Sequence, residues 1–316
     1  MSFNSFSGHV PREFGNMTML QSLFIGINKL SGNILKEIGS LTNLQSLSMS
    51  FNNFSGEVPG EIGNLTMLQL LNVRSNKLSG TIPKEIGALT NLQTLRMDLN
   101  KFSGHLPRDI WNLTMLQNLD LGYNKLTGTI PKEIGALTNL ETLSMGSSNF
   151  SGHVPRDIWN LTMLQNLDLS YNKLSGNIPR EIGSLTNLQI LTMSWNSLSG
   201  RVVREIRNLT MLQELYLDGN NFVGSIPSNF GSESGLHILG LGINSFSGEI
   251  PASICNLRSL KILYLSYNNL EGALPDCMGN LSTSLLILHP PFECKSTYWP
   301  HPINIQRGLL LGFENP

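Results

Sequence analysis

The sequence predicts an α/β solenoid, a right-handed superhelix of short coils with a parallel β-sheet on its concave side. Leucine recurs at every 24th position from Leu23 to Leu263, without an insertion or deletion. A fixed period in this range is typical of repeat proteins, in which each unit is too small to bury its own apolar face and must stack on its neighbours. Charged residues make up only 14% of the chain and the net charge is −1. That balance disfavours nucleic acid and anionic membranes as partners.

The repeat divides the chain into three parts. Residues 1–16 are a partial first repeat, residues 17–280 are eleven repeats of 24 residues, and residues 281–316 are a degenerate last repeat with an irregular tail. The chain contains no apolar run of the length that spans a bilayer, and its first residues do not have the pattern of a basic segment followed by an apolar one. We therefore expect neither a transmembrane helix nor a signal peptide in this chain.

The first half of each repeat contains a short strand and a polar turn. In the repeat that starts at Leu89, the period of two in residues 95–98 places Leu95 and Met97 inward and Arg96 and Asp98 outward on a strand. Asparagine follows this strand in almost every repeat, where its amide can hydrogen-bond backbone groups at the strand end. The column comprises Asn28, Asn52, Asn76, Asn100, Asn124, Asn172, Asn196, Asn220, Asn244 and Asn268. Ser148 interrupts it, so we expect the weakest turn there.

The second half of each repeat predicts an extended edge and then a helical turn. Glycine stands at the sixteenth place of all eleven repeats, as Gly104 does, and indicates a positive φ angle or a close backbone approach. Proline follows three places later in nine repeats, which favours an extended strand edge and a turn. The next segment, such as Lys84 to Gly87, is too short for more than about one turn of helix. We place it on the convex side.

Written as LxxLxxLxLxxNxLxGxIP, the repeat resembles the plant-type leucine-rich repeat of receptor-like kinases and receptor-like proteins. The resemblance covers residues 17–280, and residues 254–285 resemble the C-terminal coils of receptor-like proteins. It implies a curved solenoid, without a cofactor, that binds a peptide, a protein or a cell-wall fragment outside the cell and acts with a membrane co-receptor kinase. The chain departs from the family at both ends, because it starts inside a coil and loses the repeat after Leu288. We therefore interpret it as a fragment of a larger receptor-like protein.

Three cysteines lie near the C-terminal end of the chain. Cys255 and Cys277 fall in neighbouring coils, so the geometry permits a disulfide between them. Two buried free thiols are an equally open alternative. Cys294 would have no partner, and the sequence has no cluster of metal ligands at short spacing.

Eight N-x-S/T sequons indicate glycosylation if the chain is secreted. Five of them are 48 residues apart and should line up on the convex side of alternate coils; they are Asn16, Asn64, Asn112, Asn160 and Asn208. The other interpretation is that Asn-Leu-Thr only belongs to the start of the helical turn, with threonine as a cap.

Aromatic and acidic residues at outward positions of the concave sheet predict a ligand-binding surface, because such side chains are typical of peptide-binding faces. The predicted patch comprises Asp120, Tyr123, Asp168, Tyr171, Trp195, Tyr216 and Asp218. The alternative is that aromatic residues simply suit strands. Trp111 and Trp159 fall on the convex side, where the sequence does not decide between packing and exposure.

The sequence favours recognition over catalysis. Asp120 and Asp168 lie two coils apart, roughly 9 to 10 Å at the usual strand spacing, which an inverting glycosidase could use. An open sheet offers little desolvation to tune an acid, and duplication of a two-coil block explains the pair without catalysis. We therefore predict a non-catalytic extracellular module that binds a peptide or protein on its concave face. The alternatives are a secreted inhibitor of cell-wall-degrading enzymes, similar to polygalacturonase-inhibiting proteins, and a truncated, non-functional remnant.

Overall fold

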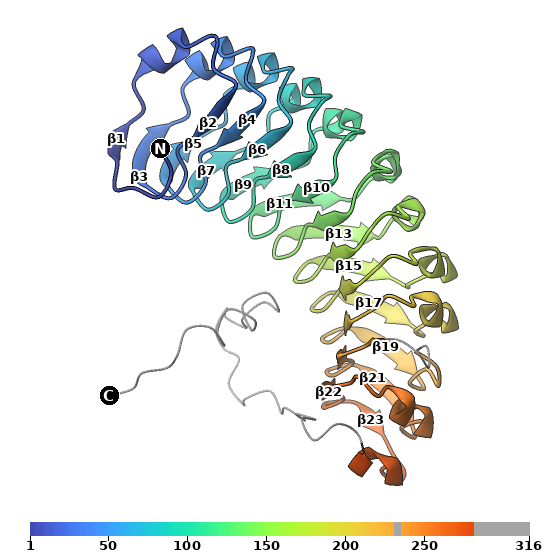
Figure 1. The fold of residues 1–316 in the computed structure, drawn as a ribbon. Helices are drawn as coiled ribbons and strands as arrows, with labels where there is room; N and C mark the ends of the chain where they lie inside the picture. Colours follow the sequence, from blue (N-terminus) through green and yellow to red (C-terminus); the bar gives the residue numbers. More distant parts are fainter. Residues whose placement is uncertain (231–234, 281–316) are drawn as a thin grey trace, which may run out of the picture.

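The computed structural model describes residues 1–230 and 235–280. In these ranges the coils follow one another along a continuous arc from the N-terminal strand to the last helical turn (Figure 1). The predicted solenoid class is confirmed. Cys294 and the degenerate part predicted for residues 281–316 lie outside the described residues.

The concave side of the arc is a parallel sheet of eleven strands within the described residues. Its strands are β2 (Ser22–Phe24), β4 (Ser46–Ser48), β6 (Leu70–Asn72), β8 (Thr94–Arg96), β10 (Asn118–Asp120), β12 (Thr142–Ser144), β14 (Asn166–Asp168), β16 (Ile190–Thr192), β18 (Glu214–Tyr216), β20 (Ile238–Gly240) and β22 (Ile262–Tyr264). Leu119 pairs with Leu95 on one side and with Leu143 on the other. Equivalent residues of successive repeats therefore form straight columns across the sheet.

A second parallel sheet, of twelve strands within the described residues, runs along the flank of the arc. Its strands are β1 (Ser7–His9), β3 (Lys29–Asn33), β5 (Asn53–Gly56), β7 (Lys77–Gly80), β9 (Lys101–Gly104), β11 (Lys125–Thr129), β13 (Asn149–His153), β15 (Lys173–Gly176), β17 (Ser197–Gly200), β19 (Asn221–Gly224), β21 (Ser245–Gly248) and β23 (Asn269–Leu270). The sequence predicts the extended segments, and Gly104 has the expected positive φ of 76°. It does not predict that these segments pair into one continuous sheet.

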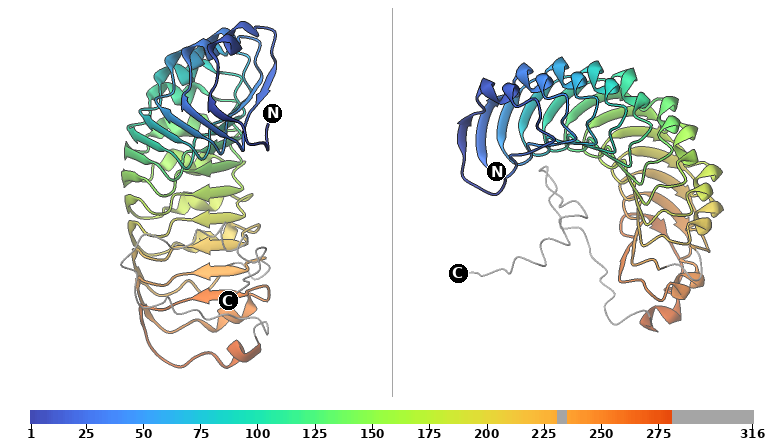
Figure 2. Two further views of the ribbon diagram at one scale, coloured as in Figure 1. Left: turned by 90° about the vertical axis from the view of Figure 1, so that its left-hand side faces the viewer. Right: turned by 45° about the horizontal axis from the view of Figure 1, so that its top comes forward.

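The convex side is built from 3-10 turns of five residues each (Figure 2). They are η1 (Arg12–Asn16), η2 (Lys36–Ser40), η3 (Gly60–Asn64), η4 (Lys84–Ala88), η5 (Arg108–Asn112), η6 (Lys132–Ala136), η7 (Arg156–Asn160), η8 (Arg180–Ser184), η9 (Arg204–Asn208), η10 (Ala252–Asn256) and η11 (Asp276–Asn280). A proline in extended conformation precedes most of them, as Pro83 precedes η4 with φ −66° and ψ 139°. None of these turns, across the described part of the chain, has the length that a membrane span needs.

The core lies between the two sheets and the convex turns. Leu95, Leu119 and Leu143 are fully buried beneath the concave sheet, and Phe102 and Phe150 are fully buried at the flanking one. The two convex tryptophans also belong to the core, because Trp111 is 5% exposed and Trp159 is fully buried. The question that the sequence left open for these tryptophans is thus answered in favour of packing.

The asparagine column forms the ladder that the sequence predicts. Asn124 donates through Nδ2 to the carbonyl oxygens of Met97, Leu121 and Gly122 at 3.0 to 3.1 Å. Ser148 cannot reproduce this pattern, since its hydroxyl oxygen is buried without a hydrogen-bond partner. The turn at Ser148 therefore lacks the bonds that its neighbours have.

Cys255 and Cys277 form a disulfide that joins η10 to η11, with their Cα atoms 5.9 Å apart. Of the two alternatives that the sequence left open, the structure contains the disulfide.

The five asparagines of the regularly spaced sequons are all exposed, at the C-terminal ends of η1, η3, η5, η7 and η9. Each of these positions leaves room for a glycan.

Candidate ligand-binding face

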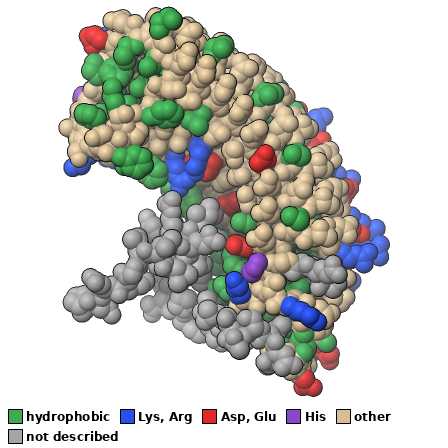
Figure 3. Space-filling view, viewed as in Figure 1, with side chains coloured by type: hydrophobic (Ala, Val, Ile, Leu, Met, Phe, Trp, Pro, Cys, Tyr) green, Lys and Arg blue, Asp and Glu red, His purple; other side chains and the backbone are tan. Residues whose placement is uncertain are grey.

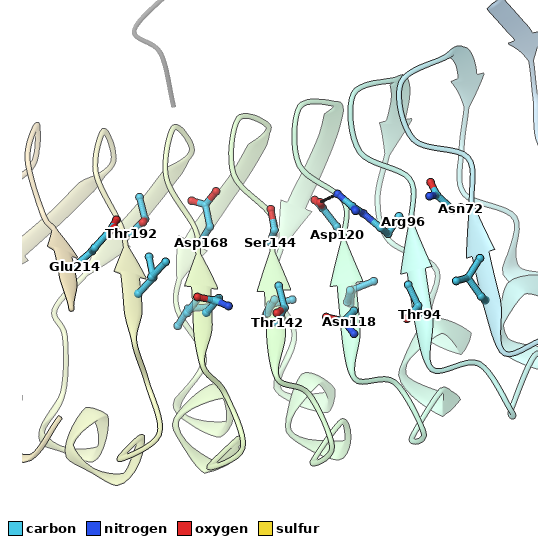
Figure 4. Close-up of a pocket in the computed structure, with 16 residues that line it drawn as sticks. Asn72, Thr94, Arg96, Asn118, Asp120, Thr142, Ser144, Asp168, Thr192 and Glu214 are labelled. Carbon is cyan, nitrogen blue, oxygen red and sulfur yellow. Dashed lines mark hydrogen bonds and ion pairs between the residues drawn. The ribbon is translucent and has the colours of Figure 1, made fainter. Parts of the chain in front are cut away.

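The concave sheet carries a shallow groove with a volume of about 580 Å³. Two rows of side chains line it, one at the starts and one at the ends of the strands (Figure 4). The lining residues are Leu70, Asn72, Thr94, Arg96, Asn118, Leu119, Asp120, Thr142, Leu143, Ser144, Asn166, Leu167, Asp168, Ile190, Thr192 and Glu214. They come from seven neighbouring strands, β6 to β18, so a ligand in this groove must be elongated across the sheet.

The middle of the row at the strand starts is small, polar and uncharged, between Leu70 at one end and Ile190 and Glu214 at the other. Thr94, Asn118, Thr142 and Asn166 stand on four successive strands, in register with one another. Hydroxyl and amide groups both donate and accept hydrogen bonds, and thus suit the backbone of an extended peptide. The prediction missed this row, because single threonines and asparagines do not stand out in a sequence until the register aligns them.

A network of charges occupies the N-terminal half of the face. Asp98 is 3% exposed and lies between two arginines, with Arg74 Nε at 3.2 Å and Arg96 Nε at 3.7 Å. Arg96 also reaches Asp120, 3.4 Å from its Nη2 atom. Burial, together with the charge of Asp120, raises the pKa of Asp98 to about 7 although both arginines oppose the shift. Figure 3 shows acidic and basic side chains close together in the hollow of the arc.

The C-terminal half of the face is dominated by carboxylates. Asp168 accepts hydrogen bonds from the backbone nitrogen and the hydroxyl of Ser170, at 2.9 and 2.6 Å. Asp218 bridges the coils on either side, accepting from Ser194 Oγ at 3.2 Å and from the Gly242 nitrogen at 3.1 Å. Burial raises the pKa of Asp218 to about 6, and burial also raises the pKa of Glu214.

Three of the predicted aromatic residues form a ridge along the ends of the strands. Tyr123, Tyr171 and Trp195 occupy the same place in their repeats and have φ angles of 53°, 51° and 56°. Tyr171 and Trp195 stack, with ring centroids 5.9 Å apart and an interplanar angle of 16°. Glycine, as at Gly219 in the same column, adopts this backbone without strain. Non-aromatic residues of the same column share it, such as Ser75 and Ile243 with φ angles of 53° and 51°, so this backbone belongs to the turn of the repeat rather than to the aromatic rings.

Tyr216 differs from the rest of the predicted patch, since it is only 8% exposed. Its hydroxyl donates to Glu214 Oε2 at 3.2 Å, within its own strand. Burial, reinforced by the charge of Glu214, raises the pKa of this tyrosine well above its usual range. Of the predicted patch, the structure therefore places Asp120 and Asp168 in the lining of the groove. Tyr123, Tyr171 and Trp195 stand outside that lining, on the ridge at the ends of the strands, and Tyr216 is withdrawn from the surface. Asp218 lies one coil beyond Trp195, bonded to Ser194.

The arrangement suits binding through charge, hydrogen bonds and aromatic contact. Within residues 1–230 and 235–280, no group of three or more His, Cys, Asp or Glu side chains is placed to hold a metal ion. The groove extends across seven neighbouring strands of the concave sheet (Figure 4). Such a surface can contact many residues of a ligand at once.

Comparisons with known proteins place the chain in a family. A model of the leucine-rich repeat region matches residues 52–150 and 130–226, and a leucine-rich repeat model matches residues 259–281. These matches span more than half of the chain, so the protein belongs to the leucine-rich repeat family. No curated protein matches the sequence.

Solved structures identify the type of repeat. The crystal structure of a TDR receptor is 30% identical, with a TM-score of 0.83, over 90% of this chain and 54% of that one. The ectodomain of the Arabidopsis receptor kinase HAESA, in complex with an IDA peptide hormone ligand, is 31% identical with a TM-score of 0.65, over 90% of this chain and 57% of that one. The chain thus has the fold of a plant-type receptor ectodomain and spans about half the length of these receptors.

The same fold also occurs in a protein with another ligand. The crystal structure of a plant ice-binding protein is 31% identical with a TM-score of 0.64, over 70% of this chain and 71% of that one. Since one fold carries different ligands, the function must be argued from the side chains on the concave face.

Proposed function

We propose that this chain is a non-catalytic recognition module, belonging to a plant cell-surface receptor-like protein or kinase, that binds a peptide or protein ligand on its concave face. The observation that carries the proposal is the groove across β6 to β18, which polar and acidic side chains line, together with the aromatic ridge at the ends of the concave strands. Aromatic side chains with few rotatable bonds contribute much of the binding energy in protein interfaces. The HAESA ectodomain, a structural neighbour, was solved with a peptide hormone.

The module would act outside the cell and signal with a membrane co-receptor kinase. The chain spans only about half the length of the receptors it is similar to. A parallel sheet of straight columns provides the rigid support that a preorganised binding surface needs.

Single substitutions on the two faces test this proposal. A library of synthetic extended peptides is screened for binding, and the dissociation constants of the binders are measured by calorimetry. Tyr171→Ala and Trp195→Ala should each weaken binding about tenfold or more, as expected for a central aromatic contact. Lys84→Ala and Lys132→Ala, exposed on η4 and η6 of the convex side, should have no effect. The opposite pattern would overturn the proposed face. Trp111 and Trp159 cannot serve as controls because both are buried.

A further inference from the structure

A duplicated block gives the concave face two matched subsites. Residues 107–143 closely match residues 155–191, and the duplication repeats the motif Leu-Asp-Leu-x-Tyr-Asn. Its first copy supplies Asp120 and Tyr123 and its second supplies Asp168 and Tyr171. Each copy therefore pairs a carboxylate at a strand end with an aromatic ring on the ridge.

The two subsites share the same backbone support. In the first, the Gly122 nitrogen donates to Asp120 Oδ1 at 3.2 Å, and in the second the Ser170 nitrogen donates to Asp168 Oδ1 at 2.9 Å. Both carboxylates are thus held by the backbone two residues further on. The tyrosines follow with φ angles of 53° and 51°. The subsites differ in their further partners, because Asp120 also faces Arg96 at 3.4 Å and Asp168 also accepts from Ser170 Oγ at 2.6 Å. A cationic group that contacts a carboxylate and a ring can nevertheless make the same two contacts in each.

The strand between the subsites presents only small side chains. Asp120 pairs in register with Ser144, which pairs with Asp168, so the carboxylates are two strand spacings apart. At the usual spacing of parallel strands this is about 9.6 Å. Gly146 lies next to the second carboxylate, and a Cβ there would come within 2.7 Å of Asp168 Oδ2. No large side chain therefore stands on the concave face between the two carboxylates.

The charge of the groove favours a cationic ligand. Its lining contains one cation, Arg96, against the three carboxylates of Asp120, Asp168 and Glu214. Arg96 is already shared between Asp98 and Asp120, at 3.7 and 3.4 Å. Lysine or arginine side chains of a ligand would complement the remaining negative charge and could pack against the neighbouring tyrosine rings.

The spacing of the subsites selects a conformation of the ligand. In a β-strand, side chains on one face are about 6.8 Å apart at i and i+2 and about 13 Å apart at i and i+4. In a polyproline II helix, with three residues per turn, side chains at i and i+3 share a face and are about 9.3 Å apart. Only the polyproline II spacing of about 9.3 Å matches the two coils that separate Asp120 from Asp168. Exposed aromatic rings, such as those of the ridge beside this groove, are a usual contact surface for this helix.

We propose that the concave face binds a polyproline II segment with basic residues at positions i and i+3, one in each Asp–Tyr subsite. This inference rests on the proposed function and specifies its ligand. The segment would lie along the aromatic ridge, with its basic side chains directed at Asp120 and Asp168.

Isomeric peptides test the spacing. Three proline-rich peptides of equal length each contain two arginines, at positions i and i+2, i and i+3, or i and i+4. Their dissociation constants for the full chain are measured by calorimetry. The peptide with arginines at i and i+3 should bind about tenfold more tightly than its isomers, the expected value of one charge-assisted contact. Asp120→Asn and Asp168→Asn should each remove this advantage. Asp109→Asn and Asp157→Asn, which have the same 48-residue separation on the convex turns η5 and η7, should leave it unchanged.

The outcomes separate this inference from the proposed function. Equal affinities for the three isomers, the absence of binding by all of them, or indifference to both Asp→Asn variants would overturn the inference. If Trp195→Ala nevertheless weakens the binding of another peptide, the concave face remains the binding face. If the convex variants alone weaken binding, both proposals fail.

Discussion

The side chain of Asn124 accepts a hydrogen bond through Oδ1 from the backbone nitrogen of Phe102, 22 residues earlier, at 3.0 Å. Its Nδ2 group shares its two protons among three carbonyl oxygens, so this one asparagine contacts four backbone groups in two coils. Asn124→Ala should therefore lower the free energy of unfolding by about 2 to 4 kcal/mol, since buried polar groups without partners cost about 1 to 3 kcal/mol each. Urea denaturation followed by circular dichroism measures the loss. A change below about 0.5 kcal/mol would show that water replaces the ladder.

The reverse substitution tests the same principle at the gap in the column. Ser148→Asn should raise the free energy of unfolding by about 1 to 2 kcal/mol, because an amide there can bond backbone groups, whereas the buried hydroxyl oxygen of Ser148 has no partner. By the register of the repeats, the new amide should accept from the Leu126 nitrogen and donate to the Leu121 carbonyl. Asn124 makes the equivalent bonds with Phe102 and Met97. A destabilised variant would mean that the turn around Ser148 has adapted to the smaller side chain.

Asp218 should make stability depend on pH. Burial raises its pKa to about 6 in the folded chain, against about 3.9 in an unfolded one. Between these values the unfolded chain releases the proton while the folded chain keeps it, so stability falls as pH rises from about 4 to about 6. The effect is at most about 3 kcal/mol. Asp218→Asn does not titrate, so its stability relative to the natural chain should increase over this range. Urea midpoints at both ends of the range check the prediction, and a constant difference would contradict it.

Gly146→Ala should displace the carboxylate of the second subsite. The new Cβ would lie 2.7 Å from Asp168 Oδ2, so the carboxylate must move and strain its hydrogen bonds from the nitrogen and hydroxyl of Ser170. We expect the free energy of unfolding to fall by about 1 kcal/mol, the usual value of one such hydrogen bond. Affinity for the arginine peptide should fall about fivefold or more, since the displaced carboxylate is half of the second subsite. Gly60→Ala, on the convex turn η3, is the matched control.

Much of the fold follows from columns of single residues. The leucine period predicts the coils, the asparagine column predicts the ladder, and the proline and glycine positions predict the flanking extended segments. Pairing of those segments into a second sheet is not predictable in the same way, because it depends on how coils stack rather than on the pattern within one coil. Trp111 and Trp159 illustrate the same point, since their burial depends on neighbouring coils.

Less of the candidate site than of the fold can be predicted from the sequence. Outward alternation identifies Asp120, Asp168 and the aromatic ridge, because strand period alone determines which side they face. The same alternation predicts that Tyr216 is exposed on this surface. In the structure its hydroxyl donates to Glu214 of the same strand, and the side chain is buried. The buried position of Asp98 between Arg74 and Arg96 is likewise a property of three neighbouring coils.

The disulfide between Cys255 and Cys277 should protect the C-terminal coils alone. It closes a loop of 22 residues between η10 and η11, for which chain entropy predicts a stabilisation of about 3 kcal/mol. Because each coil contacts mainly its neighbours, the effect should not extend far along the array. In the double variant Cys255→Ser and Cys277→Ser, amide hydrogen exchange should accelerate in β22 and β23, while β10 to β14 keep the protection of the natural chain. Hydrogen exchange with mass spectrometry resolves these strands. Equal acceleration in all of them would show that the array unfolds as one cooperative unit, and unchanged exchange in β22 would show that packing rather than the disulfide holds the last coils.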